Sequence, residues 1–233
     1  MSLTERTRIK ICGLTRECDV DAAVAAGVDA IGLVLYNQSP RHVTVARAAE
    51  LARRLPPFVT PVLLFVNHST SEIIAAHAVV TGATAQFHGD ETASQCQHAA
   101  DLAHCPWLRA ARIPMGQSGG SFDLLKFVAN HSRAHGIVLD AKVDGYGGSG
   151  QTFDWSLLPA YVDAHLILSG GLNADNVTAG IMQARPRCKT LSVDVSTGVE
   201  VAGHKGIKDH DKINRFVAAV RAADQLYSIT HHV

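Results

Sequence analysis

Short apolar segments alternate with amphipathic or alanine-rich segments along the whole chain. The apolar segments are rich in Ile, Val and Leu, which is typical of strands buried in a parallel sheet. The predicted strands cover residues 8–12, 30–35, 62–66, 84–87, 107–113, 137–140, 166–168 and 191–194. Helical patterns follow them at 22–26, 45–54, 71–80, 93–103, 122–129, just after Asp154, at 175–183 and at 211–223.

Eight strand–helix units without a break in composition predict an α/β fold, a single (β/α)8 TIM barrel with right-handed crossovers. The 233 residues are close to the usual length of such a barrel. The alternative is an open doubly wound sheet, which usually carries a Gly-x-Gly-x-x-Gly turn after its first strand. Here that turn reads Cys12-Gly-Leu-Thr15. We therefore predict one barrel domain over residues 8–233, preceded by a short tail over 1–7.

The charge and cysteine content limits the possible partners. Lys and Arg number 21 against 21 Asp and Glu, with no basic stripe, so nucleic acid is not an expected partner. No apolar run is long enough to span a membrane, and the polar N-terminus lacks a signal-peptide core. The 5 cysteines are widely spaced without a Cys-x-x-Cys pair, which argues against disulfides and zinc. We expect a reduced, cytoplasmic protein, either a monomer or a homodimer.

Polar residues end or follow most of the predicted strands. In a barrel these strand ends meet at one face, where active sites are built, so we expect the residues to converge: Cys12, Arg41, Asn67, His88, Asp140 and Asp194. Asp140 is the most informative, because it ends an apolar strand and precedes the glycine-rich segment 144–150. Glycines let a backbone approach a ligand closely, which places Asp140 at the lip of a pocket. A surface acid before a flexible loop is the simpler interpretation.

Glycine turns after the seventh and eighth strands predict a phosphate site. Gly170 and Gly171 precede a helix that Asn173 could cap, and Ser196, Thr197 and Gly198 follow the last strand. Backbone N–H groups at helix starts bind phosphate, and barrels often use these two loops for it. The Gly-Gly pair could also form an ordinary tight turn.

These motifs, in this order, resemble the phosphoribosylanthranilate isomerase family of tryptophan biosynthesis. The resemblance rests on the segments Lys10-Ile-Cys-Gly-Leu-Thr15, Gly27-Val-Asp-Ala-Ile-Gly-Leu-Val-Leu-Tyr36, Ser39-Pro-Arg41, Phe65-Val-Asn67, His88-Gly-Asp-Glu91, Leu139-Asp140, Tyr146-Gly-Gly-Ser-Gly-Gln-Thr-Phe-Asp-Trp155, Ser169-Gly-Gly-Leu172 and Val193-Asp194. Three features depart from the family: the polar tail, Asn37-Gln38 in place of Pro-Lys, and Phe87 in place of Leu.

The resemblance implies a cofactor-free Amadori rearrangement of N-(5′-phosphoribosyl)anthranilate to 1-(2-carboxyphenylamino)-1-deoxyribulose 5-phosphate. An acid must protonate the ring oxygen and a base must remove the C2′ proton. Our hypothesis makes Asp140 the acid and Cys12 the base. A nearby Lys10 or Arg41 would raise the thiolate fraction of Cys12. Alternatively, Cys12 is a small packed residue, which is also our interpretation of the other cysteines.

Three further residues are assigned to substrate binding. Arg41 would hold the planar carboxylate of anthranilate, unless it is only a solvated loop charge. Asp194 could orient the sugar or the bridging amine, or bond its own loop. His88 could line the aromatic pocket or satisfy a hydrogen bond in the core. The two interpretations of each residue remain open at the level of the sequence.

Other functions fit parts of the pattern. The aminoaldose isomerase of histidine biosynthesis performs the same rearrangement with two aspartates, so Cys12 argues against it. Indoleglycerol phosphate synthase shares the phosphate site but depends on lysine. A thiol hydrolase would need a histidine that activates Cys12. A non-catalytic barrel that binds a phosphosugar is the remaining alternative.

Overall fold

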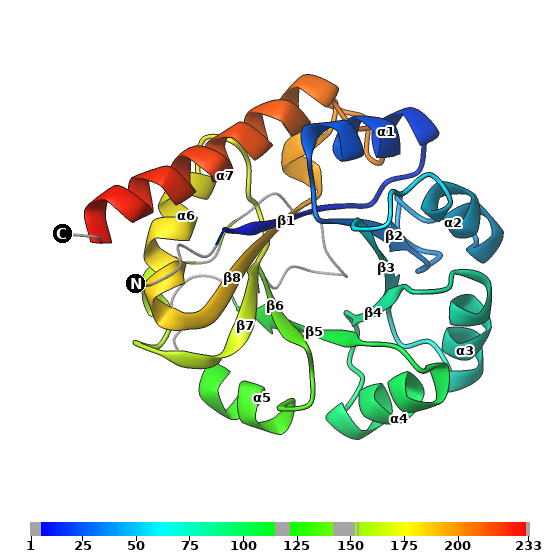
Figure 1. The fold of residues 1–233 in the computed structure, drawn as a ribbon. Coiled ribbons are helices and arrows are strands. Elements are labelled where there is room, and N and C mark those ends of the chain that lie inside the picture. The colour runs from blue at the N-terminus through cyan, green and yellow to red at the C-terminus, as the bar shows by residue number, and fades with distance from the viewer. Residues whose placement is uncertain (1–5, 115–121, 142–151, 153, 232–233) are drawn as a thin grey trace.

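The strands form one closed parallel barrel in the computed structural model, which describes residues 6–114, 122–141, 152 and 154–231. Each strand pairs with the next, and β1 pairs with β8 to close the barrel, which confirms the predicted TIM barrel (Figure 1). The strands are β1 (Arg8–Cys12), β2 (Ala30–Val34), β3 (Thr60–Phe65), β4 (Thr84–Phe87), β5 (Trp107–Ile113), β6 (Gly136–Ala141), β7 (Val162–Leu168) and β8 (Cys188–Val195).

Helices surround the barrel on its outside (Figure 1). In the described part of the chain these are α1 (Glu17–Ala26), α2 (Val45–Ala52), α3 (Thr70–Val79), α4 (Ala93–Ala103), α5 (Leu124–Asn130), α6 (Val177–Ala184) and α7 (His210–His231), with short 3-10 turns η2 (Trp155–Leu157), η3 (Arg185–Arg187) and η4 (Thr197–Val199). None of the described helices is both long enough and apolar enough to cross a membrane.

Two helices are longer than the apolar pattern predicts. Helix α1 begins at Glu17, where its first turn carries acidic residues that suit the positive end of the helix dipole. Helix α7 continues past residue 223, and its later apolar residues Leu226 and Ile229 are exposed. The end of α7 thus extends beyond the part that packs on the core, whereas the added first part of α1 contains Val20, which is buried in the core.

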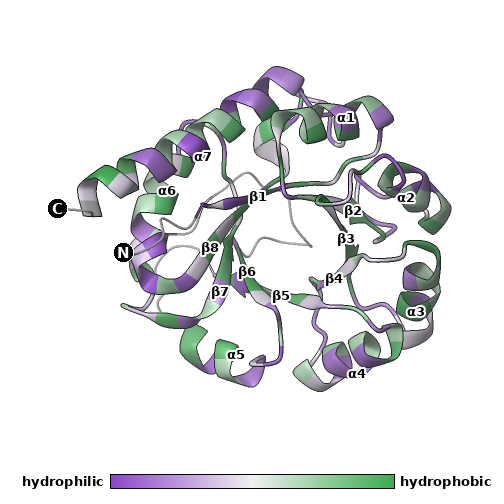
Figure 2. Ribbon diagram, viewed as in Figure 1, coloured by the Kyte–Doolittle hydropathy of each residue, from purple (hydrophilic) through white to green (hydrophobic). Residues whose placement is uncertain are grey.

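The core is divided between the helix layer and the barrel interior. Figure 2 shows mainly hydrophobic residues along the strands and a mixture along the outer helices. The large cluster between strands and helices includes Trp107, Phe87 and Phe216. Two small apolar clusters lie apart from it, one of Ala110, Val138 and Ile167, the other of Cys12, Val34, Leu64 and Val66. The second cluster places the Cys12 thiol among apolar side chains.

Two residues of the expected tail are described. Arg6 forms an ion pair with Asp29. Thr7 is buried, and its backbone N–H and its hydroxyl both donate to the carboxylate of Asp224 on α7. The chain is therefore tied to the last helix immediately before β1 begins.

Candidate active site

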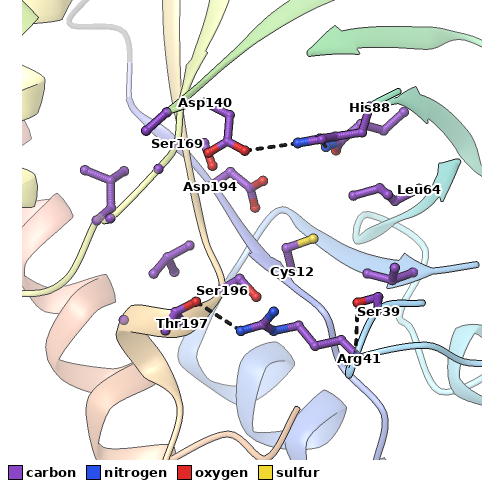
Figure 3. A pocket seen from close by; sticks show the side chains of 18 of the residues that line it. Cys12, Ser39, Arg41, Leu64, His88, Asp140, Ser169, Asp194, Ser196 and Thr197 are labelled. Carbon is purple, nitrogen blue, oxygen red and sulfur yellow. Dashed lines mark hydrogen bonds and ion pairs between the residues drawn. The ribbon is translucent and has the colours of Figure 1, made fainter. Parts of the chain in front are cut away.

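A pocket lies at the carboxyl ends of the strands. All residues that the sequence analysis assigned to catalysis, substrate or phosphate line it: Cys12, Arg41, His88, Asp140, Gly170, Gly171, Asp194, Ser196, Thr197 and Gly198. Asn67, which was expected to converge with them, lines a separate pocket instead. Figure 3 shows Asp140 and His88 toward one end, Arg41 and Thr197 toward the other, and Cys12 and Asp194 between them. Cys12 and Asp140 thus open into one shared space. The glycine-rich segment 144–150 and most of the loop 141–153, whose motion the sequence left open, lie outside the described residues.

The Cys12 side chain occupies space that a glycine leaves open. Cys12 ends β1, and Gly32 is its register partner on β2. A Cβ atom on Gly32 would lie 2.5 Å from the Cys12 sulfur, closer than atoms can pack. Any other residue at position 32 would therefore displace the thiol, so Gly32 is part of how the sequence positions Cys12.

Lys10 and Asp194 form a buried ion pair beside the thiol. The β1–β8 register places them opposite each other, and Lys10 Nζ donates to Asp194 Oδ2 over 2.9 Å. Burial lowers the pKa of Lys10, but the charges of Asp194 and Cys12 outweigh it and the pKa is raised. Asp194 Oδ1 is buried and accepts no hydrogen bond from any described residue. The pocket therefore contains a carboxylate oxygen with an unused acceptor position.

The thiol of Cys12 is less acidic than the sequence analysis expected. Burial raises its pKa and so does the negative charge of Asp194, while Lys10 and Lys208 lower it only in part. Lys10 is the neighbour that was predicted, but desolvation of the thiolate outweighs its attraction. Burial therefore works against the gain in thiolate that the sequence analysis expected from Lys10.

Asp140 is bonded to His88, which follows β4. His88 Nε2 lies 3.0 Å from Asp140 Oδ2, and its Nδ1 lies 3.1 Å from the amide nitrogen of Gln86. With Gln86 donating to Nδ1, the ring proton is on Nε2 and is donated to an ionised Asp140. With the Gln86 amide turned over, Nδ1–H donates to its oxygen and Nε2 accepts from a protonated Asp140. The orientation of Gln86 is thus linked to the charge of Asp140.

Arg41 is held by an acid that the sequence analysis missed. Its Nε and Nη2 atoms donate to both oxygens of buried Glu200 over 2.7 and 2.8 Å, and Nη2 also donates to Thr197 Oγ1 over 3.0 Å. Burial raises the pKa of Glu200, but the Arg41 bond and Lys208 outweigh it and hold the pKa below its ordinary value. Arg41 is not a solvated loop charge, and only its Nη1 makes no hydrogen bond to a described residue.

Lys208 is the other residue that the sequence analysis missed. Its buried Nζ donates to Glu200 Oε1 over 3.1 Å and to the Ser196 carbonyl oxygen over 3.0 Å. Nothing local marks Glu200 or Lys208, because each is one charged residue among several in a polar loop. Their burial depends on the pairing of residues 199–209 across a turn, which no short motif reveals.

The glycine turns after β7 and β8 depend on glycine for their backbone shape and their close approach. Gly170 and Gly171 have φ of 74° and 64°, in the left-handed region that glycine adopts freely. Their N–H groups donate to no described residue. A Cβ atom on Gly198 would lie 2.0 Å from the carbonyl oxygen of Leu172, so only glycine lets the two loops approach this closely. We call these residues, with Ser196 and Thr197, the phosphate cup.

The helix after the first glycine turn begins later than predicted. Asn173 is not its cap, because α6 begins at Val177 and Asn176 occupies the cap position. Instead, Asn173 Oδ1 accepts the N–H groups of Asp175 and Asn176, and Asn176 donates to the Gly171 carbonyl oxygen over 3.0 Å. An extra turn separates the glycines from α6, and the two asparagines fix that turn.

The remaining candidate groups are structural. Glu91 is buried against Arg109 and accepts the N–H groups of Asn67 and Gly89. Cys96 and Cys188 are buried as expected, Cys105 is half-buried, and Cys18 is exposed, so the packed interpretation is wrong for Cys18.

Cys18 also belongs to a possible metal-ligand group. Within the described residues, the only three-residue group spaced to hold a metal is Cys18, Asp19 and His210. The Asp19 oxygens already accept bonds from Arg16, His210 and the Lys208 N–H. A metal ion would have to compete with Arg16 for that carboxylate.

Comparison with known proteins gives one consistent result. Residues 9–219 match the family model of N-(5′-phosphoribosyl)anthranilate (PRA) isomerase. The N-(5′-phosphoribosyl)anthranilate isomerase of Methylibium petroleiphilum is 58% identical over 219 residues, covering 94% of this chain and 96% of the relative.

Solved structures show the same relationship. The crystal structure of the Thermotoga maritima phosphoribosyl anthranilate isomerase is 36% identical with a TM-score of 0.79, covering 93% of this chain and 99% of that one. An isomerase structure in complex with reduced 1-(o-carboxyphenylamino)-1-deoxyribulose 5-phosphate is 32% identical with a TM-score of 0.74, covering 93% and 99%.

Proposed function

The chain belongs to the N-(5′-phosphoribosyl)anthranilate isomerase family, and we propose that Cys12 and Asp140 are the base and the acid of its reaction. It is an isomerase of tryptophan biosynthesis that converts the aminoaldose N-(5′-phosphoribosyl)anthranilate to the corresponding aminoketose. The observation that carries the proposal is that these two groups line one pocket, with His88 bonded to Asp140 and the buried Lys10–Asp194 pair beside Cys12.

The acid step opens the sugar ring. Asp140 gives its proton to the ring oxygen, the bond from C1′ to that oxygen breaks, and the lone pair of the bridging nitrogen forms a C1′=N iminium. Asp140 must be protonated at this point, which requires the form in which His88 Nε2 accepts from it. Gln86 must then present its oxygen to Nδ1, because a ring nitrogen that carries a proton needs an acceptor.

The base step moves a hydrogen from C2′. The Cys12 thiolate removes the C2′ proton, and the electron pair forms a C1′=C2′ bond while the nitrogen becomes neutral. The resulting enol loses its O–H proton and C1′ gains one, giving the ketone at C2′. Electrons are only redistributed within the substrate, so the protein has to supply proton transfer alone.

A hydrogen bond from the substrate to Asp194 would favour the thiolate of Cys12. Asp194 raises the pKa of Cys12, and its Oδ1 has room for a donor. An N–H or O–H of the substrate that donates to Oδ1 would reduce the charge that Cys12 senses, while Lys10 remains as its counter-ion. In this scheme Asp194 both orients the substrate and couples its binding to activation of the base.

The two anionic ends of the substrate fit the other residues. We place the sugar phosphate on the amides of the phosphate cup, and the anthranilate carboxylate on Nη1 of Arg41. Glu200 already accepts hydrogen bonds from Nε and Nη2. The substrate carboxylate would therefore accept from Nη1 alone, and not from two nitrogens at once as the sequence suggested.

The structure offers no support for the hydrolase alternative. Both ring nitrogens of His88 are used, one on Asp140 and one on Gln86, so this histidine does not activate the thiol. We propose that the protein is a monomer or a homodimer. We propose residues 8–233 as the catalytic unit and the cytoplasm as its location, since all cysteines are free thiols.

A substrate without its phosphate tests the cup. Purified protein should turn over N-(5′-phosphoribosyl)anthranilate, followed by the change in anthranilate fluorescence, and should turn over the dephosphorylated analogue poorly. Phosphate binding by several main-chain amides should contribute at least about 100-fold in kcat/KM. Equal kcat/KM values for the two compounds would show that the cup does not hold the phosphate.

A further inference from the structure

The side chain of Lys208 has no exposed surface, and its partial lowering of the pKa of Cys12 is the only effect on the reaction described so far. A buried lysine is costly unless its charge is compensated, so its position calls for an explanation. Its Nζ atom makes three bonds, to Glu200 Oε1 (3.1 Å), to the Ser196 carbonyl oxygen (3.0 Å) and to Ser196 Oγ (3.3 Å). Two of the three reach Ser196, a residue of the phosphate cup.

The backbone of Lys208 is fixed from the side away from the pocket. Its N–H donates to Asp19 Oδ2 over 3.2 Å, and its carbonyl oxygen accepts from Arg16 Nη2 over 3.4 Å. The residue pairs antiparallel with Glu200, and Asp209 N donates to the Val199 carbonyl oxygen over 2.9 Å. The backbone from which the lysine side chain extends is therefore held in place by Asp19, Arg16 and Glu200.

The charges of the network do not cancel. Arg41 and Lys208 share Glu200, which leaves one positive charge more than negative in a buried cluster. The cluster touches both polar side chains of the cup, since Arg41 bonds Thr197 and Lys208 bonds Ser196. By contrast, Lys10 and Asp194 cancel each other. An excess positive charge behind a cup of N–H groups attracts an anion strongly in a medium of low dielectric constant.

We propose that Lys208 is a positioning residue for phosphate binding: it fixes Ser196 in the cup and supplies, from behind, the unbalanced positive charge that a phosphomonoester dianion requires. The ammonium group does not touch the phosphate. It acts on it by holding Ser196 in place and through its positive electrostatic potential. This inference rests on the proposed assignment of the cup, and it adds a residue that lies ten positions beyond Gly198, the last residue of the cup.

The test measures phosphate binding separately from turnover. Inorganic phosphate is the probe, as a competitive inhibitor of the wild-type enzyme and of Lys208→Met, with KM and kcat measured on the same samples. Loss of one charge-assisted interaction predicts an inhibition constant and a KM that rise about 10-fold or more. Because Lys208 also lowers the pKa of Cys12 in part, kcat at neutral pH should fall too, but by no more than about 3-fold and by less than KM rises.

Lys212→Met is the matched control. Lys212 also belongs to this region, but its Nζ donates to the Glu200 carbonyl oxygen over 2.8 Å and makes no recorded bond to the cup. The control should leave the inhibition constant and KM within about 2-fold of wild type. If Lys208→Met does not fold, Lys208→Gln replaces it, because the amide can still donate to Ser196 but carries no charge; its phosphate affinity should also fall about 10-fold.

The outcomes separate this inference from the assignment on which it rests. If phosphate does not compete with substrate in the wild type, the cup assignment fails. If phosphate competes in the wild type and the folded Lys208 variants bind it equally well, the role of Lys208 is refuted while the cup stands. A loss confined to kcat, with KM and the inhibition constant unchanged, would also refute it.

Discussion

Two buried ion networks lie at the pocket and differ in how completely they are bonded. In the Lys10–Asp194 pair, beside the thiol, one carboxylate oxygen has no partner among the described residues. In the network of Arg41, Glu200 and Lys208, the carboxylate of Glu200 accepts four hydrogen bonds, the fourth from the Gly206 N–H. Both are buried, so exposure to solvent does not explain the difference.

The difference indicates that the two networks have different roles, one in binding the substrate and the other in holding cationic side chains. A buried acceptor without a partner costs free energy unless a ligand satisfies it, so Asp194 is suited to receive the substrate. The carboxylate of Glu200 has all its acceptor positions used, so it is suited to hold Arg41 and Lys208 in place rather than to bind a ligand. On this basis the thiol end of the pocket should control kcat, and the end with Arg41 and Lys208 should control KM.

The largest effect is expected at the reacting end. Cys12→Ala and Asp140→Asn should each lower kcat at least about 100-fold, because each removes a group that transfers a proton. Steady-state kinetics with the fluorescent substrate measure this. Cys18→Ala, which removes an exposed thiol outside the pocket, is the control and should leave kcat unchanged. Near-normal turnover in either variant would reject that residue's role.

A smaller effect, of a different type, is expected at the binding end. Arg41→Ala should raise KM by about 10-fold to 100-fold with little change in kcat, because a charge-assisted contact to the substrate is lost. It should also lower the free energy of unfolding by about 3 kcal/mol, since Glu200 loses its main partner. Arg54→Ala is the control, as Arg54 pairs with Asp21 at the surface. An unchanged KM would contradict the assignment of Arg41.

The smallest effect is on stability in acid. The folded pKa of Glu200 lies below its ordinary value of 4.5, so its ionised form stabilises the fold above that pH. This stability is lost as the pH falls through the lowered value, because the unfolded chain takes up the proton first. Urea unfolding of Glu200→Gln should therefore depend less steeply on pH below about pH 4.5 than the wild type. Identical slopes would show that the carboxylate is not held ionised.

The sequence predicted the barrel and most of the pocket for a simple reason. Short runs of β-branched residues mark the strands, and a parallel barrel gathers the residues at their ends, as it does with Cys12 and Asp140. The start of α6 could not be predicted in this way. The helix after Gly171 begins later because Asn173 and Asn176 build an extra turn through side-chain bonds, which capping preferences alone do not reveal.

Charge placement was the least predictable part of the site. Glu200 and Lys208 become buried only when residues 199 and 209 pair, so their role depends on tertiary structure. The acidity of Cys12 depends on a balance between burial and Lys10, and a sequence shows only the second of these. The position of a residue at a strand end predicts that it lies in the pocket. Its protonation depends on burial and on neighbouring charges, which only the folded structure reveals.

The most direct test is a crystal structure of this enzyme with reduced 1-(o-carboxyphenylamino)-1-deoxyribulose 5-phosphate. The account predicts the phosphate on the amides of Gly170, Gly171 and Gly198, with the Cys12 sulfur near C2′ and the Asp140 carboxyl group near the oxygen that left the ring. A phosphate bound outside the cup, or a C2′ atom beyond contact with the sulfur, would contradict it.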